Sequence, residues 1–176
     1  MTTHATIDIE TLGTKPDTVV LTIGGIKFDP HADDGLHSEF YYRLDVNEQL
    51  EKGRSVMDST LDWWSKQDKD VYEEALGEDN RTPVLEVLKA LNKWLVSVDK
   101  IWCQGPVFDI CILENLYKQI GLHHNWPFYI IRDSRTLFSL MDKDPRKEID
   151  FAAHNALADA IVQSLCIQKV YKKLDI

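Results

Sequence analysis

The sequence predicts an α/β fold in which helices cover a mixed β-sheet. Three segments with strand-like composition come first and are separated by turns, which indicates an antiparallel meander. Segments with helical and strand patterns then alternate to the end of the chain, which is typical of helices packed on a sheet. A chain of 176 residues can bury a core of its own, so we expect one domain over residues 1–176.

The first strand is expected in the stretch ATIDIETLGT, residues 5–14. Side chains alternate between the faces of a strand, so Asp8 and Glu10 share one face while Ile7 and Ile9 point into the opposite layer. Two neighbouring carboxylates repel each other and resist burial unless solvent or a cation lies between them. Carboxylates and water are the ligands of Mg²⁺ and Mn²⁺, so this pair is a candidate metal site. The alternative is an edge strand with a solvated polar face.

Two more strands follow. Residues 18–28 are rich in β-branched side chains, and the pair Gly24-Gly25 indicates a bulge or a close approach of another backbone. A turn-rich stretch comes next, and residues 39–44 are expected to form the third strand. The direct succession of these strands is the reason for expecting antiparallel pairing.

Helices dominate the remaining elements. Residues 58–67 are expected to form a helix capped by a serine or threonine, with Leu61 and Trp64 on its buried side. A second helix is expected after Thr82-Pro83, with threonine as the cap and proline in the first helical position. The later elements are a strand at residues 100–104, a helix from Pro106 to a left-handed cap at Gly121, a strand at residues 128–131 and a helix over residues 155–174.

The composition describes an acidic globular protein. The formal net charge is −9, which argues against a broad electrostatic grip on a nucleic-acid duplex but allows a small anion to bind at a metal centre. Three cysteines leave one unpaired in any disulfide scheme, which favours a reducing cytosol. The N-terminus lacks a secretory pattern, and no run approaches the ~20 apolar residues of a membrane span. We therefore expect a cytoplasmic protein without membrane contact.

Three further residues are candidates to complete a site with the first strand. Asp109 lies in the first turn of a helix, where the helix dipole alone would favour a carboxylate, but the preceding strand would bring it to the edge of the sheet where α/β folds bind ligands. Asn155 can cap the last helix, which places Asp159 one turn inside. His154 can share a site with Asp159 only if the histidine belongs to the preceding loop, because five helical residues separate side chains by about 140°. A solvated surface histidine is the alternative.

The joint pattern resembles the three exonuclease motifs of the DEDDh branch of the DEDD superfamily. It consists of Asp-x-Glu on the first strand, an aspartate at the start of a middle helix and His-x₄-Asp at the start of the last helix. The sequence segments IDIETLG, GPVFD, RDSRTL and HNALADA are similar to those of the small 3′–5′ exonucleases of phages, of the exonuclease A (DexA) type, and of their bacterial exoribonuclease relatives. The resemblance extends from Thr6 to about Leu165.

This resemblance implies a ribonuclease H-like three-layer fold with helices on both faces of the sheet. It also implies that Asp8, Glu10, Asp109 and Asp159 hold two divalent cations, Mg²⁺ or Mn²⁺, with Asp8 bridging both. Such a pair stabilises the attacking and leaving oxygens of an in-line displacement at phosphorus. His154 would be the general base, since imidazole is suited to proton transfer near neutral pH. The product would be a nucleoside 5′-monophosphate from the 3′ end.

Substrate contacts are expected close to these ligands. In similar enzymes the loop equivalent to Thr11, Leu12 and Gly13 offers backbone groups to the terminal sugar, with the leucine side chain beside the base. Of the adjacent pair Trp63 and Trp64, Trp64 fits the buried side of its helix, so Trp63 is the better candidate for stacking on a base, although the assignment could be reversed. Three charged residues, Arg132, Asp133 and Arg135, follow a predicted strand, where they would contact phosphate, order the site or form a solvated cluster.

The sequence leaves two other functions open. One is a phosphodiesterase or oligoribonuclease that acts on very short oligonucleotides, which an acidic surface would suit. The other is a catalytically inert module that binds nucleic acid, which the intact set of five site residues argues against. Single-stranded DNA or RNA with a free 3′ end is the expected partner, with DNA slightly favoured. Similar small exonucleases often pair, so the resemblance leaves a homodimer open, although the residues themselves do not indicate one. A phage-encoded protein would act in the host cytosol.

Overall fold

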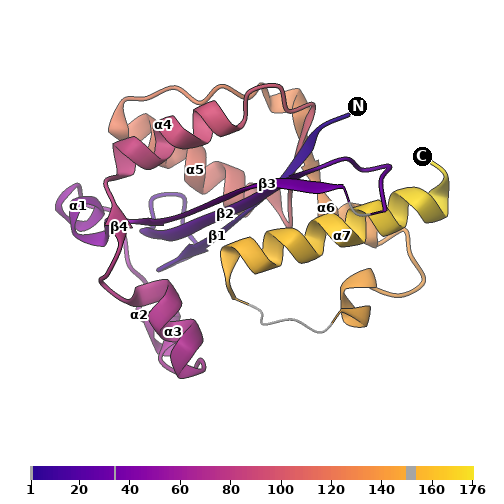
Figure 1. Ribbon diagram of the computed structural model, residues 1–176. Coiled ribbons are helices and arrows are strands. Elements are labelled where there is room, and N and C mark those ends of the chain that lie inside the picture. The colour runs from indigo at the N-terminus through magenta and orange to yellow at the C-terminus, as the bar shows by residue number, and fades with distance from the viewer. Residues whose placement is uncertain (1, 34, 150–153) are drawn as a thin grey trace.

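The computed structural model describes residues 2–33, 35–149 and 154–176, and it has a six-stranded mixed sheet at its centre (Figure 1). The strand order is β4-β3-β2-β1-β5-β6. The first three strands pair antiparallel, whereas the pairs β3–β4, β1–β5 and β5–β6 are parallel. The strands are β1 (His4–Thr11), β2 (Val20–Phe28), β3 (Leu36–Leu44), β4 (Arg81–Thr82), β5 (Lys100–Cys103) and β6 (Ile131–Asp133). The predicted mixed sheet with antiparallel first strands is confirmed.

Helices cover both faces of this sheet, as the predicted three-layer fold requires. Figure 1 shows α4 (Val84–Trp94) and α5 (Pro106–Ile120) over one face and α7 (Ala156–Leu174) across the other. Near one end of the sheet lie α2 (Asp58–Trp64) and α3 (Lys69–Leu76). The shorter elements are α1 (Val46–Glu51), α6 (Ser134–Phe138) and the 3₁₀ turns η1 (Phe128–Ile130) and η2 (Pro145–Glu148).

The two faces of β1 have different neighbours. Ile7 and Ile9 are buried in the larger apolar cluster, which includes Leu88 of α4 and Leu113 of α5. Asp8 and Glu10 point to the opposite face, which is the face covered by α7. The alternation predicted for this strand is therefore present, and it places both carboxylates in the layer of the last helix.

Gly24 allows α7 to approach the sheet closely. A Cβ atom at this position would overlap the backbone of Ala156 and Leu157 in the first turn of α7. The predicted close approach at Gly24-Gly25 is thus correct, and its cause is a helix backbone on β2. Because Gly24 pairs with Asp8 across the β1–β2 ladder, the same contact brings the start of α7 next to Asp8.

The helix predicted over residues 58–67 begins at Asp58, as expected, but ends at Trp64, and the caps predicted for this helix and for the one after Thr82-Pro83 are wrong. α2 begins after Met57, which makes no side-chain capping bond, and Leu61 is 39% exposed, so only Trp64 of the expected pair is buried. At α4 the residue before the helix is Pro83, and the Glu48 carboxylate accepts the hydrogen bond from the Val84 N–H at 3.0 Å. A residue distant in sequence therefore replaces the expected threonine cap.

The strand predicted at residues 128–131 is also wrong. Residues 128–130 form the 3₁₀ turn η1, and the strand begins only at Ile131. The side chains of Phe128 and Tyr129 are largely exposed, so their β-propensity is not used in the sheet. In contrast, Gly121 ends α5 with φ +74°, and Asn155 caps α7, as predicted. Within the described residues, none of the helices has the length and apolar character needed to cross a membrane.

We predict that Gly24→Ala destabilises the protein by about 1–3 kcal/mol, the usual cost of forcing a methyl group into a packed interior. The new Cβ would also push the start of α7 away from Asp8, so divalent-cation affinity should fall. Urea unfolding and calorimetric titration with Mn²⁺ measure the two effects. Gly25→Ala is the control on the other face of β2, where the nearest atoms belong to the Trp94 ring. An unchanged Mn²⁺ affinity in Gly24→Ala would contradict the coupling.

Candidate active site

The site forms where β1 meets the first turn of α7. Asp8, Glu10 and Asp159 each offer a carboxylate oxygen, and these atoms all lie within 4.8 Å of one another. With His154 and Gln163, the three carboxylates line a hollow of about 230 Å³. Residues separated by about 150 positions in the sequence thus meet in one small volume.

Local hydrogen bonds fix the start of α7. The Asn155 side chain accepts bonds from the Leu157 N–H at 3.1 Å and the Ala158 N–H at 3.0 Å, which satisfies two free donors of the first turn. The Asp159 carboxylate accepts a further bond from the His154 N–H at 2.8 Å. His154 itself has φ +69° and lies outside the helix, which is the condition under which it can share a site with Asp159. Its backbone therefore orients one acidic side chain while its ring faces the hollow.

Asp109 lies in the first turn of α5, in the helix layer on the other face of the sheet, and is not among the residues that line the hollow. Its side chain is only 4% exposed. Burial raises the pKa of Asp109 to about 7, while backbone hydrogen bonds and the Arg135 charge partly oppose the shift. The Asp109 charge is, after burial, the largest cause of the raised pKa of Asp8. The fourth acidic residue is therefore electrostatically coupled to the strand pair, although it is not among the three mutually close carboxylates.

Burial and mutual repulsion disfavour the charged forms of these carboxylates. Burial and the charges of Asp109, Glu10 and Asp159 raise the pKa of Asp8 well above its ordinary range. Burial together with Asp159 and Asp109 raises the pKa of Glu10 to about 8. Such clusters of hard oxygen ligands with excess negative charge suit divalent cations, which remove the repulsion by supplying the opposite charge. The donor set therefore fits Mg²⁺ or Mn²⁺.

The two tryptophans of α2 have different positions. Trp64 is 1% exposed, and its indole N–H donates to the Thr11 carbonyl at 3.0 Å, so it ties α2 to the end of β1. Trp63 is 39% exposed and places its ring edge-on to the His154 ring, with 4.8 Å between the centroids. Trp63 therefore borders the site with a free aromatic surface, whereas Trp64 belongs to the core.

In this structure the end of β1 and the loop after it have internal partners for the groups that were expected to contact the substrate. Leu12 is 5% exposed and packs with Val19 and Leu21, so its side chain is not available to a base. The Leu12 N–H donates to Val19 and its carbonyl accepts from Met57, so both backbone groups are already used. Thr11 donates its hydroxyl hydrogen bond to the Gly13 carbonyl at 2.6 Å. Added side-chain bulk at Gly13 would meet Thr18 and Met57, so packing is sufficient to explain that glycine.

The charged residues of β6 and the start of α6 divide into two groups. Arg135 donates to the Gln104 carbonyl at 3.2 Å, and its charge lowers the pKa of Asp109, so it lies near the cluster. Asp133 caps α6 by accepting from the backbone of Arg135 and Thr136. Arg132 donates to the carbonyls of Tyr129 and Ile131. Asp133 and Arg132 thus have local structural partners that explain their presence.

Two site residues were missed by reasoning from the sequence. Gln163 donates to the Asp8 carboxylate at 3.0 Å, and its own carbonyl oxygen accepts from Ser134 at 3.2 Å. Its place one turn after Asp159 is a signal that could have been used, because side chains four residues apart share a helix face. Arg146 also lines the hollow, held by two bonds to Asp144 at 3.0 and 2.5 Å. The sequence around Arg146 has no comparable spacing that would have indicated a site residue.

Comparisons with known proteins agree with this geometry. The family model of the 3′–5′ exoribonuclease Rv2179c-like domain matches residues 3–171. The exodeoxyribonuclease of Enterobacteria phage T4 is 26% identical over 188 aligned positions, which cover 87% of this chain and 82% of the phage protein.

Solved structures with the same fold include two nucleases. The nuclease domain of 3′hExo, a DEDDh family member bound to rAMP, has a TM-score of 0.62 at 12% identity and covers 97% of this chain and 92% of that domain. Exonuclease I of E. coli, in complex with dT13, has a TM-score of 0.73 at 13% identity; the match spans 99% of this chain but 42% of exonuclease I. The fold is therefore that of the ribonuclease H-like exonucleases. Because the family model covers nearly all of the sequence, the chain belongs to the Rv2179c-like 3′–5′ exoribonuclease domain family.

Proposed function

We propose that residues 1–176 act as a single exonuclease domain that removes nucleoside 5′-monophosphates from the 3′ end of single-stranded nucleic acid. The observation that carries the proposal is the meeting of Asp8, Glu10 and Asp159 in one hollow with His154 at its border. Family membership supports the direction of cleavage. The small hollow favours recognition of one terminal nucleotide, and the net charge of −9 disfavours a broad grip on a duplex.

Four carboxylates would hold two divalent cations, Mg²⁺ or Mn²⁺. Asp8, Glu10 and Asp159 would hold the ions in the hollow, and Asp109 would contribute its carboxylate directly or through water. When bound, such a pair stabilises the attacking and leaving oxygens of an in-line displacement at phosphorus and lowers the pKa of the attacking water. Gln163 supports this role of Asp8 because its amide fixes one carboxylate oxygen and leaves the other free to turn toward the hollow.

His154 would accept the proton of the attacking water at an imidazole nitrogen. As the water oxygen bonds to phosphorus, the bond from phosphorus to the 3′ oxygen of the preceding nucleotide breaks, and that oxygen takes up a proton from solvent. The contact with the Trp63 ring and the bond from the His154 N–H to Asp159 restrain the imidazole beside the cluster. The same Trp63 surface would stack on the terminal base, which is compatible with any base.

Arg135 and Arg146 would provide the positive charge that a phosphate needs in this acidic surrounding. Arg146 lines the hollow, and Asp144 holds the orientation of its guanidinium group. Arginine is suited to this contact because its planar group can donate two parallel hydrogen bonds to phosphate oxygens. Thr11, Leu12 and Gly13 would act indirectly, by fixing the end of β1, and Trp64 would support Trp63.

The proposal covers both DNA and RNA as substrates. The sequence slightly favours DNA, and the name of the phage T4 relative agrees, whereas the family is named for exoribonucleases. Activity on very short oligonucleotides is the second candidate function, which the small hollow also accommodates. The buried free thiols of Cys103 and Cys166 are consistent with a reducing cytosol. The exposed side chains of Phe128 and Tyr129 provide apolar surface for the homodimer that the resemblance to similar enzymes leaves open.

A length series of 5′-labelled DNA and RNA strands tests this function. With Mg²⁺ or Mn²⁺, the expected product is a ladder of strands shortened one nucleotide at a time from the 3′ end, and EDTA should abolish it. Cleavage of dinucleotides alone would support the short-oligonucleotide enzyme instead. Binding without product under all these conditions would contradict the proposed activity.

We predict that His154→Ala lowers kcat by roughly 10²–10⁴, the usual contribution of a general base. Mn²⁺ affinity should change little, because the backbone N–H that orients Asp159 remains. His154→Asn is a second variant that better tolerates the positive φ of this position, so it separates loss of the base from backbone strain. His123→Ala is an exposed control. A pH–rate profile that kept its height and shape in both variants would contradict the assignment.

We also predict that metal removal makes stability depend on pH. The folded-state pKa values of Glu10, about 8, and Asp109, about 7, exceed ordinary carboxyl values, so the folded state binds more protons than the unfolded chain between pH 4 and 8. The free energy of unfolding in EDTA should therefore fall as pH rises through this range. Saturating Mn²⁺ should raise stability at pH 8 by about 2.7 kcal/mol for each bound ion at a hundredfold excess over its Kd.

Asp8→Asn provides the matched variant for this experiment. It removes one charge from the cluster but keeps an oxygen for Gln163, so it should be more stable than the wild type in EDTA and gain less from Mn²⁺. It should also lack nuclease activity. Glu51→Gln is a control with the same charge change on the exposed end of α1. Lower stability of Asp8→Asn in EDTA at pH 8 would contradict the electrostatic account.

A further inference from the structure

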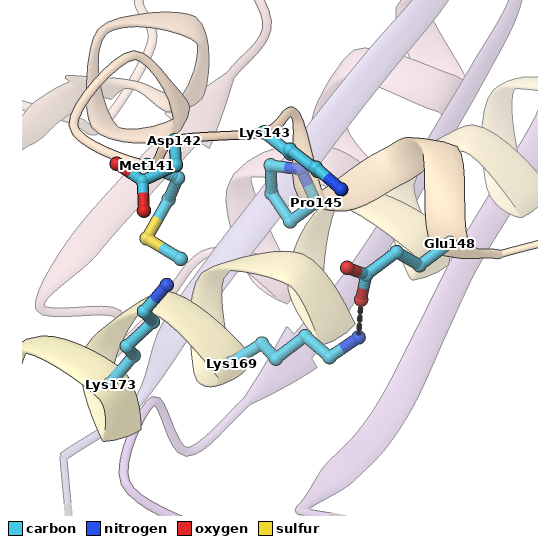
Figure 2. A pocket seen from close by; sticks show the side chains of 7 residues that line it. All are labelled: Met141, Asp142, Lys143, Pro145, Glu148, Lys169 and Lys173. Carbon is cyan, nitrogen blue, oxygen red and sulfur yellow. Dashed lines mark hydrogen bonds and ion pairs between the residues drawn. The ribbon is translucent and has the colours of Figure 1, made fainter.

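A second hollow, of about 280 Å³, lies between the segment that follows α6 and the C-terminal half of α7. Figure 2 shows its residues: Met141, Pro145 and three lysines, with the acidic Asp142 and Glu148 at the border. We call Lys143, Lys169 and Lys173 the lysine cluster. The Lys169 ammonium pairs with the Glu148 carboxylate at 2.6 Å. Lys143 and Lys173 line the same hollow, and their charges also help to lower the pKa of Glu148, after the hydrogen bond from Lys169.

The surroundings of this hollow are positive in a negative protein. Residues 141–148 and 169–173 together carry six basic and three acidic side chains, a balance of +3, whereas the whole chain carries −9. Pro145 and Met141 add an apolar wall. Ammonium groups next to an apolar wall suit a ligand that combines anionic phosphates with less polar sugars and bases.

Two lysines of the cluster, Lys169 and Lys173, lie on the helix that also carries part of the candidate active site. Val162 lines the hollow of about 230 Å³ at the candidate active site, which we call the catalytic hollow. At 100° per residue around the axis of α7, Lys169 and Lys173 point within about 20° of the direction of Val162. The rise along the helix from Val162 to Lys173 is roughly 16 Å. The turn η2 lies against α7 and borders both hollows, because Arg146 faces the catalytic one while Pro145 and Glu148 face the other.

We propose that the lysine cluster binds backbone phosphates of the substrate strand on the 5′ side of the nucleotide being removed. This inference rests on the proposed function, since a 3′–5′ exonuclease leaves only the 5′ part of the strand outside its catalytic hollow. Arg146 contacts the strand within the hollow, and the strand crosses η2 to the ammonium groups of Lys169, Lys143 and Lys173. Glu148 opposes this binding because it neutralises Lys169.

The test compares long single strands with dinucleotides. The triple variant Lys143→Ala, Lys169→Ala, Lys173→Ala should bind a long strand roughly 10–100-fold more weakly in EDTA near 0.1 M salt. The slope of log affinity against log salt should be smaller by about 1.4, from about 0.7 for each of the two lysines that Glu148 does not neutralise. With Mn²⁺, KM for the long strand should rise while kcat is unchanged. Turnover of a dinucleotide, which is too short to reach the cluster, should be unaffected.

Two further variants separate specific contacts from total charge. Lys89→Ala, Lys93→Ala, Lys118→Ala removes the same charge from exposed positions on α4 and α5, on the other face of the sheet, and should bind like the wild type. Glu148→Gln should tighten long-strand binding by about fivefold, one extra phosphate contact. If the Lys169–Glu148 pair had only a structural role, Glu148→Gln would leave the affinity for the long strand unchanged or lower it.

The inference fails if the lysine-cluster variant binds long strands like the wild type, if both triple variants weaken binding equally, or if Glu148→Gln does not tighten it. If inorganic phosphate saturated the cluster and the affinity for nucleic acid did not depend on strand length, the cluster would be a small-anion site. That result would also overturn the inference. Wild-type strand shortening tests the proposed function separately, because the binding measurements in EDTA do not depend on cleavage.

Discussion

The repulsion among buried carboxylates is the constraint around which this fold is arranged. Asp8, Glu10 and Asp159 offer oxygens within 4.8 Å of one another, and Asp109 adds its charge from a buried position. Burial and the neighbouring carboxylates raise the pKa of Glu10 to about 8, and burial raises the pKa of Asp109 to about 7, so part of this group holds protons near neutral pH when no cation is bound. The apolar layers of the fold hold these carboxylates close together. Binding of a cation should therefore stabilise the folded state.

Small backbone features make that convergence possible. Gly24 lets the first turn of α7 rest on β2, directly beside Asp8 in the β-ladder. Asn155 caps the helix, and the positive φ of His154 turns the chain so that its N–H reaches Asp159. The glycine, the cap and the turned residue each act over one or two residues, yet together they determine whether the last motif reaches the first. The lysines farther along α7 then extend the same helix face away from the site.

The sequence predicted the parts that depend on local pattern. The alternation of Asp8 and Glu10 with isoleucines, the cap at Asn155 and the end of α5 at Gly121 follow from side-chain periodicity and turn chemistry, which few distant contacts override. Features set by distant partners were not predictable. Glu48 caps α4 from 36 positions away, and Leu12 is drawn into the core by Val19 and Leu21. Arg146 reaches the site from a charged turn that resembles many solvated surface turns.

Crystals grown with Mn²⁺ and a nucleoside 5′-monophosphate would test the central claim most directly. Anomalous scattering from manganese locates the ions without assumptions about the ligands. Our account predicts two peaks in the catalytic hollow, one between Asp8, Glu10 and Asp159 and a second shared by Asp8 and Asp109, with the product phosphate beside them. Ordered phosphate with no manganese bound to Asp8, or manganese held only by residues outside this cluster, would contradict it.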